Sequence, residues 1–235
     1  MERRDRAISL IARHQGRAAE DILADVITTE FEGRIGLVSS FGTEAAVLLH
    51  MVSRIDPYVP VIFLDTQKHF PETLAYRDAL VAHLGLCNIQ VVSPRPASLE
   101  AEDPYGRLHA VNPDLCCHVR KTLPMLAALR NLECWITGRK RGQASTRATL
   151  ELVEVQDRWF KINPLLNWSS MDVEAYFRAH ELPEHPLKHR DFPSVGCAPC
   201  TEPVARNADP RSGRWAGSDK TECGIHFENG RVARR

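Results

Sequence analysis

A chain of 235 residues, 43% of them hydrophobic, can bury the core of one large domain. The 30 Lys and Arg residues balance 30 Asp and Glu residues, so net charge draws the protein neither to nucleic acid nor to a membrane, and we expect neither partner. Residues 1–6 are mostly charged and no apolar run reaches membrane-spanning length, which excludes a typical signal peptide and a membrane helix. We therefore expect a cytoplasmic protein whose seven cysteines include metal ligands or catalysts rather than disulfides.

Short apolar runs alternate with helix-like segments along the first two thirds of the chain. Strands are predicted over Ile35–Ser39, Val61–Leu64, Ile89–Val92 and residues 134–137. Helices are predicted over residues 43–51, where apolar side chains recur at helical spacing, and from Pro71, since proline is favoured in a first turn. This alternation predicts an α/β fold with a mostly parallel sheet and flanking helices.

Polar residues follow the predicted strands at the edge where parallel sheets bind ligands. The candidate substrate-binding residues at this edge are Ser39, Ser40, Phe41, Gly42, Asp65, Thr66 and Gly138. Backbone N–H groups at the start of the helix after Gly42 can hold a phosphate, although an ordinary strand-to-helix turn has the same composition. Residues 105–147 hold eight Lys or Arg against two acids, which favours a small anionic ligand over the alternative of a solvated basic face.

The last third of the chain changes character. A final helix is predicted to begin near Ser169, with Asp172 in its first turn, and to end before Pro183. Beyond that proline the chain is rich in Pro, Gly and His and has no periodicity. We expect residues 1–200 to form a single α/β domain and residues 201–235 to form a flexible C-terminal segment.

Four cysteines have the spacing of a metal centre and are called the cysteine quartet below. Cys116 and Cys117 are adjacent, after a proline-rich loop or arm predicted over residues 94–113, and Cys197 and Cys200 form a C-x2-C pair. Adjacent thiolates point in different directions in most backbone conformations and would bind one zinc ion only with strain, whereas a cluster offers separate irons. The spacing therefore favours a [4Fe-4S] cluster over zinc, and either of these over four free thiols.

Three cysteines lie outside the quartet. Cys87 and Cys134 have apolar neighbours in the sequence and are predicted to be inert core residues. Cys223 is the candidate nucleophile, because Lys220 and His226 are each three residues away and nearby cations lower the pKa of a thiol toward the reactive thiolate. A spare cysteine in the tail is the alternative interpretation.

Taken together, these motifs resemble the sulfonucleotide reductases of sulfate assimilation over nearly the whole chain. Residues 39–42 are similar to the phosphate-binding loop of that family, and residues 64–66 and 70–73 to its LDTG and FPET segments. The cysteine quartet, with Arg120 and Lys121 after its first pair, resembles the family's cluster motif. Residues 222–226 are similar to its ECGLH signature.

The resemblance implies an adenine nucleotide α-hydrolase-like (PP-loop) fold and a [4Fe-4S] cluster on the quartet. It implies thioredoxin-dependent reduction of adenosine 5′-phosphosulfate (APS) to sulfite and AMP in cysteine biosynthesis, with glutaredoxin as the alternative reductant. Cys223 would attack the sulfate sulfur and form an S-sulfocysteine. The other catalytic residues that it implies are Lys121, Arg211, Arg214 and His226, and the further substrate contact is Arg147.

Other assignments stay open at this stage. The 3′-phosphorylated nucleotide (PAPS) is the alternative substrate, and an ATP-pyrophosphatase-type enzyme or a non-catalytic iron–sulfur redox sensor are more distant alternatives. The sequence leaves open whether the chain forms a homo-oligomer. It departs from the family pattern at four positions, which are Gln67 in place of a glycine, Lys140 and Ala144 in place of arginine and serine, and Ala216 in place of a second tryptophan.

Overall fold

The computed structural model of this chain describes residues 2–144, 147–217, 220, 222–223, 225, 227–228 and 231–232. Within these residues the centre is a six-stranded sheet in the order β3-β2-β1-β4-β6-β5. Its strands are β1 (Ile35–Ser39), β2 (Val61–Leu64), β3 (Ile89–Val92), β4 (Cys134–Ile136), β5 (Val153–Gln156) and β6 (Trp159–Ile162). Neighbouring strands are parallel except for β5, which is antiparallel to β6. The predicted α/β class with a mostly parallel sheet is confirmed.

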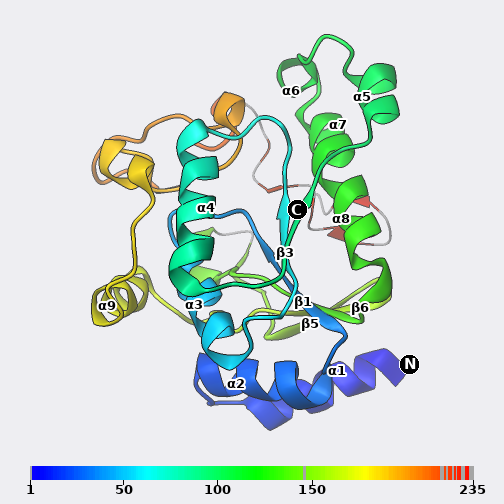
Figure 1. The fold of residues 1–235 in the computed structure, drawn as a ribbon, viewed down its shortest axis with the longest axis vertical. Coiled ribbons are helices and arrows are strands. Elements are labelled where there is room, and N and C mark those ends of the chain that lie inside the picture. The colour runs from blue at the N-terminus through cyan, green and yellow to red at the C-terminus, as the bar shows by residue number, and fades with distance from the viewer. Residues whose placement is uncertain are drawn as a thin grey trace.

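Adjacent residues of a strand supply the cores on opposite faces of the sheet. Val61 and Phe63 of β2 belong to the larger core, whereas Ile62 and Leu64 belong to a smaller core on the other face. The larger core lies against α3 (Ala45–Ile55), α4 (Pro71–Leu84) and α9 (Ser170–Ala179), and the smaller core lies against α8 (Leu123–Ala128). Figure 1 shows α4 and α8 on either side of the edge strand β3. The structure is therefore a sheet between two layers of helices.

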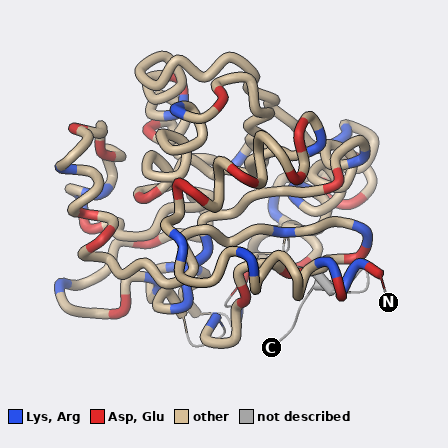
Figure 2. The backbone as a smooth tube through the Cα atoms, turned by 90° about the horizontal axis from the view of Figure 1, so that it is seen from below, with Lys and Arg blue, Asp and Glu red and all other residues tan. Residues whose placement is uncertain are grey.

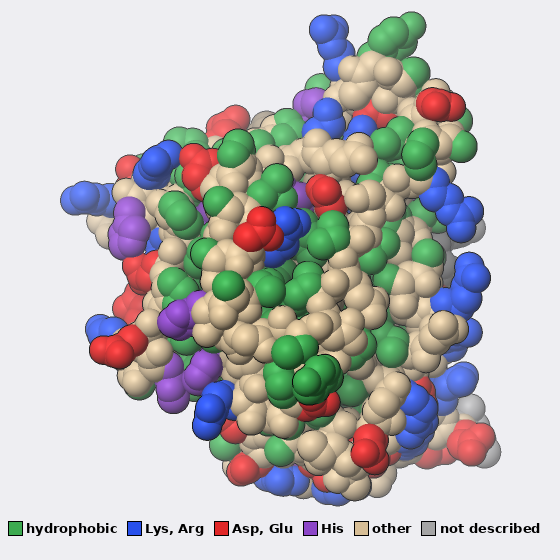
Figure 3. All heavy atoms as spheres, in the orientation of Figure 1, with side chains coloured by type: hydrophobic (Ala, Val, Ile, Leu, Met, Phe, Trp, Pro, Cys, Tyr) green, Lys and Arg blue, Asp and Glu red, His purple; other side chains and the backbone are tan. Residues whose placement is uncertain are grey.

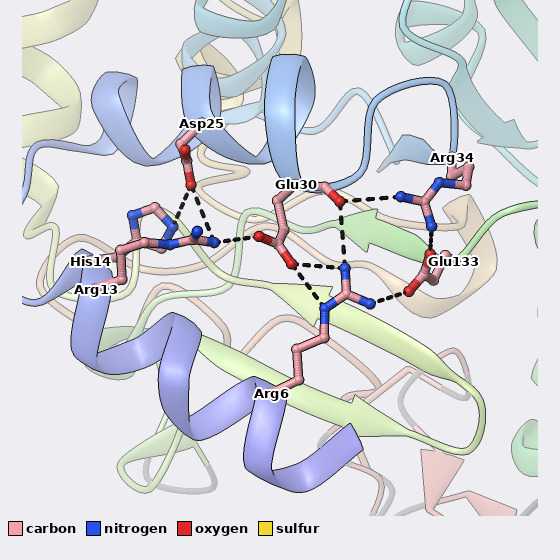
Figure 4. A network of polar contacts seen from close by, with 7 residues as sticks. All are labelled: Arg6, Arg13, His14, Asp25, Glu30, Arg34 and Glu133. Carbon is pink, nitrogen blue, oxygen red and sulfur yellow. Dashed lines mark hydrogen bonds and ion pairs between the residues drawn. The ribbon is translucent and has the colours of Figure 1, made fainter. Parts of the chain in front are cut away.

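Two N-terminal helices that the sequence patterns did not predict cover the lower end of the sheet in Figure 1. They are α1 (Glu2–His14) and α2 (Ala19–Asp25), followed by the π-helical turn η1 (Val26–Glu30). Arg6 Nε donates to Glu30 Oε1 at 2.8 Å, and Arg6 Nη1 donates to Glu133 Oε1 at 2.5 Å (Figure 4). Its guanidinium also lies over the rings of Phe31 and Phe160, 4.9 and 5.1 Å from their centroids. This network joins α1 to the residue that precedes β4.

The predicted loop over residues 94–113 is wrong in part, because this arm contains helices. They are α5 (Pro96–Glu102) and α6 (Leu108–Val111), followed by α7 (Pro113–Cys117). Proline occupies the first turn of α5 and of α7, where its missing N–H costs no hydrogen bond. Asp103 Oδ1 accepts the N–H of Leu108 at 2.8 Å and closes the turn between α5 and α6. The arm leads directly into the first cysteine pair.

The predictions for the two remaining cysteines have opposite outcomes. Cys134 is fully buried at the start of β4, as predicted for a core residue. The prediction for Cys87 is wrong, because this side chain is exposed. Cys87 follows the left-handed C-cap Gly85 of α4, and its thiol donates to the Gly85 carbonyl at 3.3 Å. A turn at the surface, rather than a strand, therefore holds this thiol.

The first part of the predicted C-terminal segment packs against the domain. Val204 N donates to Asp191 O at 2.8 Å, Trp215 N donates to Cys200 O at 3.1 Å, and the Trp215 side chain is buried. The predicted boundary after residue 200 therefore does not coincide with a break in packing. Further along, two short strands, β7 (Phe227–Glu228) and β8 (Arg231–Val232), pair with each other.

The surface carries charges of both signs. Lys and Arg alternate with Asp and Glu along the described backbone, in agreement with the zero net charge (Figure 2). Hydrophobic side chains also reach the surface on the face drawn in Figure 3. One exposed hydrophobic residue is Val91 of the edge strand β3, which is 50% exposed. No helix in the described part of the chain has the length and apolar character needed to cross a membrane.

Candidate active site

The loop after β1 holds its shape through a strained buried residue. Phe41 has φ of +49° although it is fully buried, and its ring packs edge-on against Phe63 with centroids 5.6 Å apart. The Ser39 hydroxyl accepts the N–H of Phe41 at 3.2 Å, so this hydroxyl stabilises the turn itself. A bulky residue at positive φ costs free energy, and such strain is concentrated at functional sites. The turn leaves Ser40 exposed and Gly42 partly exposed before α3.

Asp65 and Thr66, the two residues after β2, differ in their burial and in their neighbours. Asp65 is partly exposed, and its Oδ1 accepts the N–H of Gln67 at 2.9 Å. Gln67 has φ of +58°, which explains why this position favours the glycine of the family pattern. Thr66 is fully buried, and its Oγ1 lies 3.2 Å from Cys197 Sγ. Thr66, a predicted substrate contact, therefore lies beside the cysteine quartet.

The four cysteines of the quartet line one cavity. Cys116 and Cys117 come from α7, while Cys197 and Cys200 lie at the short 3-10 turn η7 (Ala198–Cys200). Burial raises the pKa of Cys116 to about 11, so this thiol needs a metal or a cation beside it to become a thiolate. Among the described residues, no three His, Cys, Asp or Glu side chains form a group that could hold one metal ion. The donors lining this cavity include the four sulfurs of the quartet and the imidazole of His109.

A widened helical turn directs Lys121 toward the same cavity. The α-helix α7 changes into the π-helical turn η2 (His118–Thr122), in which Leu123 N donates to His118 O five residues earlier. Pro124, which follows, has no N–H to donate, so the ordinary hydrogen-bond ladder is interrupted here. Lys121 lies in this turn and lines the cavity. Burial opposes the charge of Lys121, but the charge interactions with nearby cysteine sulfurs, Cys197 first and then Cys223, hold its pKa above the usual value.

Arg120, next to Lys121, has a structural role. It is 4% exposed, and its guanidinium forms an ion pair with Asp103 at 2.6 Å. Its Nη1 donates to the Thr66 carbonyl at 2.9 Å. Arg120 thus joins the arm and the end of β2 to the wall of the cavity, while Lys121 lines the cavity together with the four cysteines.

Cys223 lies beside the quartet although the sequence separates it widely from Cys117. Its sulfur accepts a hydrogen bond from the Cys117 thiol, which is the largest influence holding the pKa of Cys223 well below that of an ordinary thiol. Burial opposes this shift, and the charges of Lys121 and Arg214 lower the pKa further. The side chain is partly exposed. The structure therefore brings the candidate nucleophile to two cations and the cysteine cavity.

Arg214 has an unused donor in this neighbourhood. Its guanidinium carbon lies 4.6 Å from the centroid of the Trp215 ring, and the group also lies against Gly196. The buried Nε of Arg214 has no hydrogen-bond partner among the described residues. Buried donors are almost always paired, so this N–H is suited to an anionic ligand.

A chain of polar contacts joins the tail to the start of α3. Arg147 donates from Nε to Glu222 Oε1 at 2.6 Å and from Nη2 to Oε2 at 2.8 Å, and from Nη1 to Gln143. Gln143 Nε2 donates in turn to Glu44 Oε2 at 2.9 Å, and Lys140 Nζ lies 2.7 Å from Glu44 Oε1. The family's arginine position is thus filled by Lys140, which pairs with the residue that precedes α3.

A second buried ionic cluster, which sequence reasoning missed, lies on β5 and β6. Lys161 Nζ is 3.0 Å from Glu154 Oε2, and Arg139 also pairs with Glu154. Burial lowers the pKa of Lys161 to about 7, and the charge of Arg139 lowers it further. Burial likewise lowers the pKa of Arg211 to about 10. The available signal was the lone lysine within the otherwise apolar run of residues 159–162.

Gly138 and His226 are the last two predicted site residues, and Ala144 is a position that departs from the family pattern. Gly138 is exposed and lies two residues after the end of β4. Because β4 pairs with β1 in the sheet, Gly138 lies at the same edge of the sheet as the loop at residues 39–42. Ala144 is the last described residue before a two-residue gap and is partly exposed. His226 lies outside the described residues.

Comparison with known proteins identifies the family. The model of the phosphoadenosine phosphosulfate reductase domain matches residues 34–203. A Mesorhizobium japonicum protein named adenosine 5′-phosphosulfate reductase is 55% identical over 197 residues, which cover 84% of this chain and 78% of that protein. The chain belongs to the phosphoadenosine phosphosulfate reductase family.

Further relatives in this family extend the similarity. A Gloeobacter violaceus protein named phosphoadenosine 5′-phosphosulfate reductase is 42% identical over 222 residues, or 91% of this chain and 92% of that protein. The crystal structure of phosphoadenylyl-sulfate reductase from Candida auris, a phosphate complex, matches with a TM-score of 0.71 and 25% identity over 84% of this chain and 96% of that chain. The fold predicted from the resemblance is confirmed.

Proposed function

We propose that this protein reduces APS to sulfite and AMP through a covalent intermediate on Cys223. One observation carries the proposal: Cys223 lies beside the cysteine cavity, within the electrostatic influence of Lys121 and Arg214. The names of relatives at 55% and 48% identity support APS as the nucleotide. The reaction is a group transfer to sulfur followed by a two-electron reduction.

In the first step, the Cys223 thiolate attacks the sulfur atom of APS. A sulfur–sulfur bond forms, the bond between that sulfur and the bridging oxygen breaks, and AMP leaves with the bonding electron pair. Lys121, Arg211 and Arg214 neutralise the phosphosulfate as charge moves onto the leaving phosphate. In the second step, a thioredoxin thiolate attacks Cys223 Sγ and releases sulfite, and its second thiol resolves the mixed disulfide.

The edge at β1, β2 and β4 is proposed to hold the nucleotide. Ser40 and Gly42 precede α3, whose N-terminal N–H groups suit a phosphate, and Asp65 lies on the neighbouring strand end. The chain beyond Trp215 would hold Cys223 over the bound nucleotide and exclude water from it. His226, outside the described residues, is proposed as a further contact to the phosphosulfate.

The quartet fits a [4Fe-4S] cluster, because four thiols line one cavity and Lys121 lies among them to offset negative charge. Cys116, Cys117, Cys197 and Cys200 would be the ligands. As a ligand, Cys117 would have no proton to donate to Cys223, and the charges of Lys121 and Arg214 would be what lowers the pKa of Cys223. When bound, the cluster supplies a compact anionic centre with an electrostatic and structural role. We expect Cys197→Ser to remove both the activity and the absorption band, at a wavelength of about 400 nm, that such clusters show. A colourless but fully active variant would contradict this role.

Mass spectrometry tests the central step. Mixing the protein with APS in the absence of reductant should add about 80 Da, the mass of SO3, to the peptide that contains Cys223. Cys223→Ser should abolish the adduct and sulfite release while AMP still binds, and Cys87→Ser, at an exposed cysteine away from the site, is the matched control. An unmodified tail peptide in protein that still releases sulfite would falsify the proposal.

PAPS is the second candidate substrate, because the relative from Gloeobacter violaceus is named for it. Anaerobic turnover with APS and PAPS in parallel, with thioredoxin as reductant and sulfite as the counted product, separates the two. We expect a higher kcat/KM with APS. A preference for PAPS would keep the mechanism and change the substrate.

A further inference from the structure

Each of the three nitrogens of the Arg147 guanidinium donates to an acceptor of the protein itself. Two of its nitrogens form parallel hydrogen bonds to the two oxygens of Glu222, at 2.6 and 2.8 Å, and the third donates to Gln143. Such two-pronged geometry is the one that arginine uses for phosphate and sulfate as well as for carboxylate. The Arg147 and Glu222 side chains are 8% and 15% exposed. A buried carboxylate thus occupies donors suited to an anionic ligand.

Glu222 also compensates a second guanidinium. Its Oε2 lies 3.7 Å from Arg211 Nη2. Arg139, the next cation in this region, is paired with Glu154 instead. Without Glu222, the two guanidiniums of Arg147 and Arg211 would lie close together with less charge compensation, which is costly in a buried site.

We infer that Glu222 is an internal anion that holds Arg147 and Arg211 in the substrate-free enzyme and releases them to the phosphosulfate of the incoming nucleotide. The inference rests on the proposed function, in which Arg211 contacts the phosphosulfate, and on the substrate contact that the family resemblance implies for Arg147. Glu222 immediately precedes Cys223, so the exchange of anions also changes what anchors the nucleophile. When AMP leaves, the carboxylate returns to the arginines and completes the cycle.

Two other contacts allow the tail to stay near the site after this exchange. Gln156 Nε2 donates to the Ile225 carbonyl at 3.4 Å, and Lys220 pairs with Asp114 of α7. Neither contact involves Arg147 or Arg211, so displacement of Glu222 does not by itself free the tail. Glu222 is therefore a positioning residue that competes with the ligand, rather than a group that reacts with it.

Direct measurement of AMP binding tests the inference. If roughly nine-tenths of the free enzyme keeps Arg147 on Glu222, then removal of the competing charge tightens AMP binding about tenfold. By isothermal titration calorimetry on the anaerobically purified protein, we expect Glu222→Gln and Glu222→Ala both to bind AMP about tenfold tighter than the wild type, with the same change in the KM for APS. Glu222→Asp, which keeps the charge, should bind AMP with an affinity close to that of the wild type.

The matched control is Glu184→Gln, which neutralises a glutamate paired with Lys188 at 2.5 Å away from these arginines and should leave AMP affinity unchanged. Unchanged or weaker AMP binding in both neutral Glu222 variants, together with a wild-type protein that forms the 80 Da adduct, would overturn the inference while the proposed function stands. A wild-type protein that neither binds AMP nor forms the adduct would instead overturn the proposed function, and the inference with it.

Discussion

Gly196 has no room for a side chain, because the Arg214 guanidinium fills that space. A Cβ on residue 196 would lie 2.1 Å from Arg214 Nη2 and 2.4 Å from Cζ, well inside contact distance. The guanidinium is the mobile end of a long side chain, so Gly196→Ala should push it away from the Trp215 ring rather than unfold the domain. The stability cost should be that of a lost cation–π contact, about 0.5–1 kcal/mol.

Gly196→Ala should slow the formation of the Cys223 adduct more strongly than it lowers the stability of the fold. Arg214 lies near Cys223 and has an unused buried donor, and the loss of one such donor to a developing charge typically slows a reaction by about 100-fold. Single-turnover formation of the 80 Da adduct should slow by that order in Gly196→Ala, while the thermal midpoint falls only slightly. Gly142→Ala, where a Cβ would meet nothing within 4 Å, is the matched control and should behave as the wild type.

A double-mutant cycle completes this test. If Gly196→Ala acts only by displacing Arg214, then adding it to Arg214→Ala should cause little further loss. A Gly196→Ala enzyme with the wild-type rate, or losses that simply add in the double variant, would refute the reasoning.

Two further predictions concern stability. Gln67→Gly should raise the free energy of unfolding by up to about 1 kcal/mol, because the relief of positive φ at this residue exceeds the added entropy of the unfolded chain. Urea titration should show a higher midpoint for Gln67→Gly and no gain for the control Gln67→Ala. A lower midpoint for the glycine variant would count against strain at this residue. Lys161 has a pKa of about 7 in the folded state against 10.5 for a free lysine, so the unfolded chain binds the extra proton between these values. The free energy of unfolding should therefore rise with pH from about 7 toward 10.5, by at most about 1.4 kcal/mol per pH unit. Urea titrations at several pH values should show that this rise is absent in Lys161→Met. The same slope of unfolding free energy against pH in both proteins would contradict the prediction.

Local patterns in the sequence predicted a large part of the fold. The bounds of β1, β2 and β3 coincide with the predicted runs, since each is a short apolar segment between turn residues. The capping box of Ser169 and Asp172 likewise begins α9 where it was predicted. The hairpin of β5 and β6 was missed, because Glu154 and Lys161 interrupt its apolar pattern. These two charges are tolerated in strands only because they pair with each other across the sheet.

Local sequence patterns also indicated some features of the candidate site and missed others. The cysteine spacing identified the quartet, and the structure brings its four members to one cavity. The pairing of Arg147 with Glu222 joins residues 75 positions apart and has no local pattern. The position of Thr66 beside Cys197, rather than at the open edge, likewise depends on how the chain returns across the domain. Contacts of this kind are set by tertiary packing, which periodicity and motif spacing do not encode.

The N-terminal helices have a practical consequence for the production of this protein. The family match begins at residue 34, but α1 packs against β5, and Arg6 covers the paired rings of Phe31 and Phe160, whose centroids are 5.3 Å apart. A recombinant chain that begins at residue 34 and keeps the C-terminus would leave aromatic and aliphatic surface open to water. Exposed surface of that kind promotes aggregation, so truncation at residue 34 should yield insoluble material even though every proposed catalytic residue lies beyond that point.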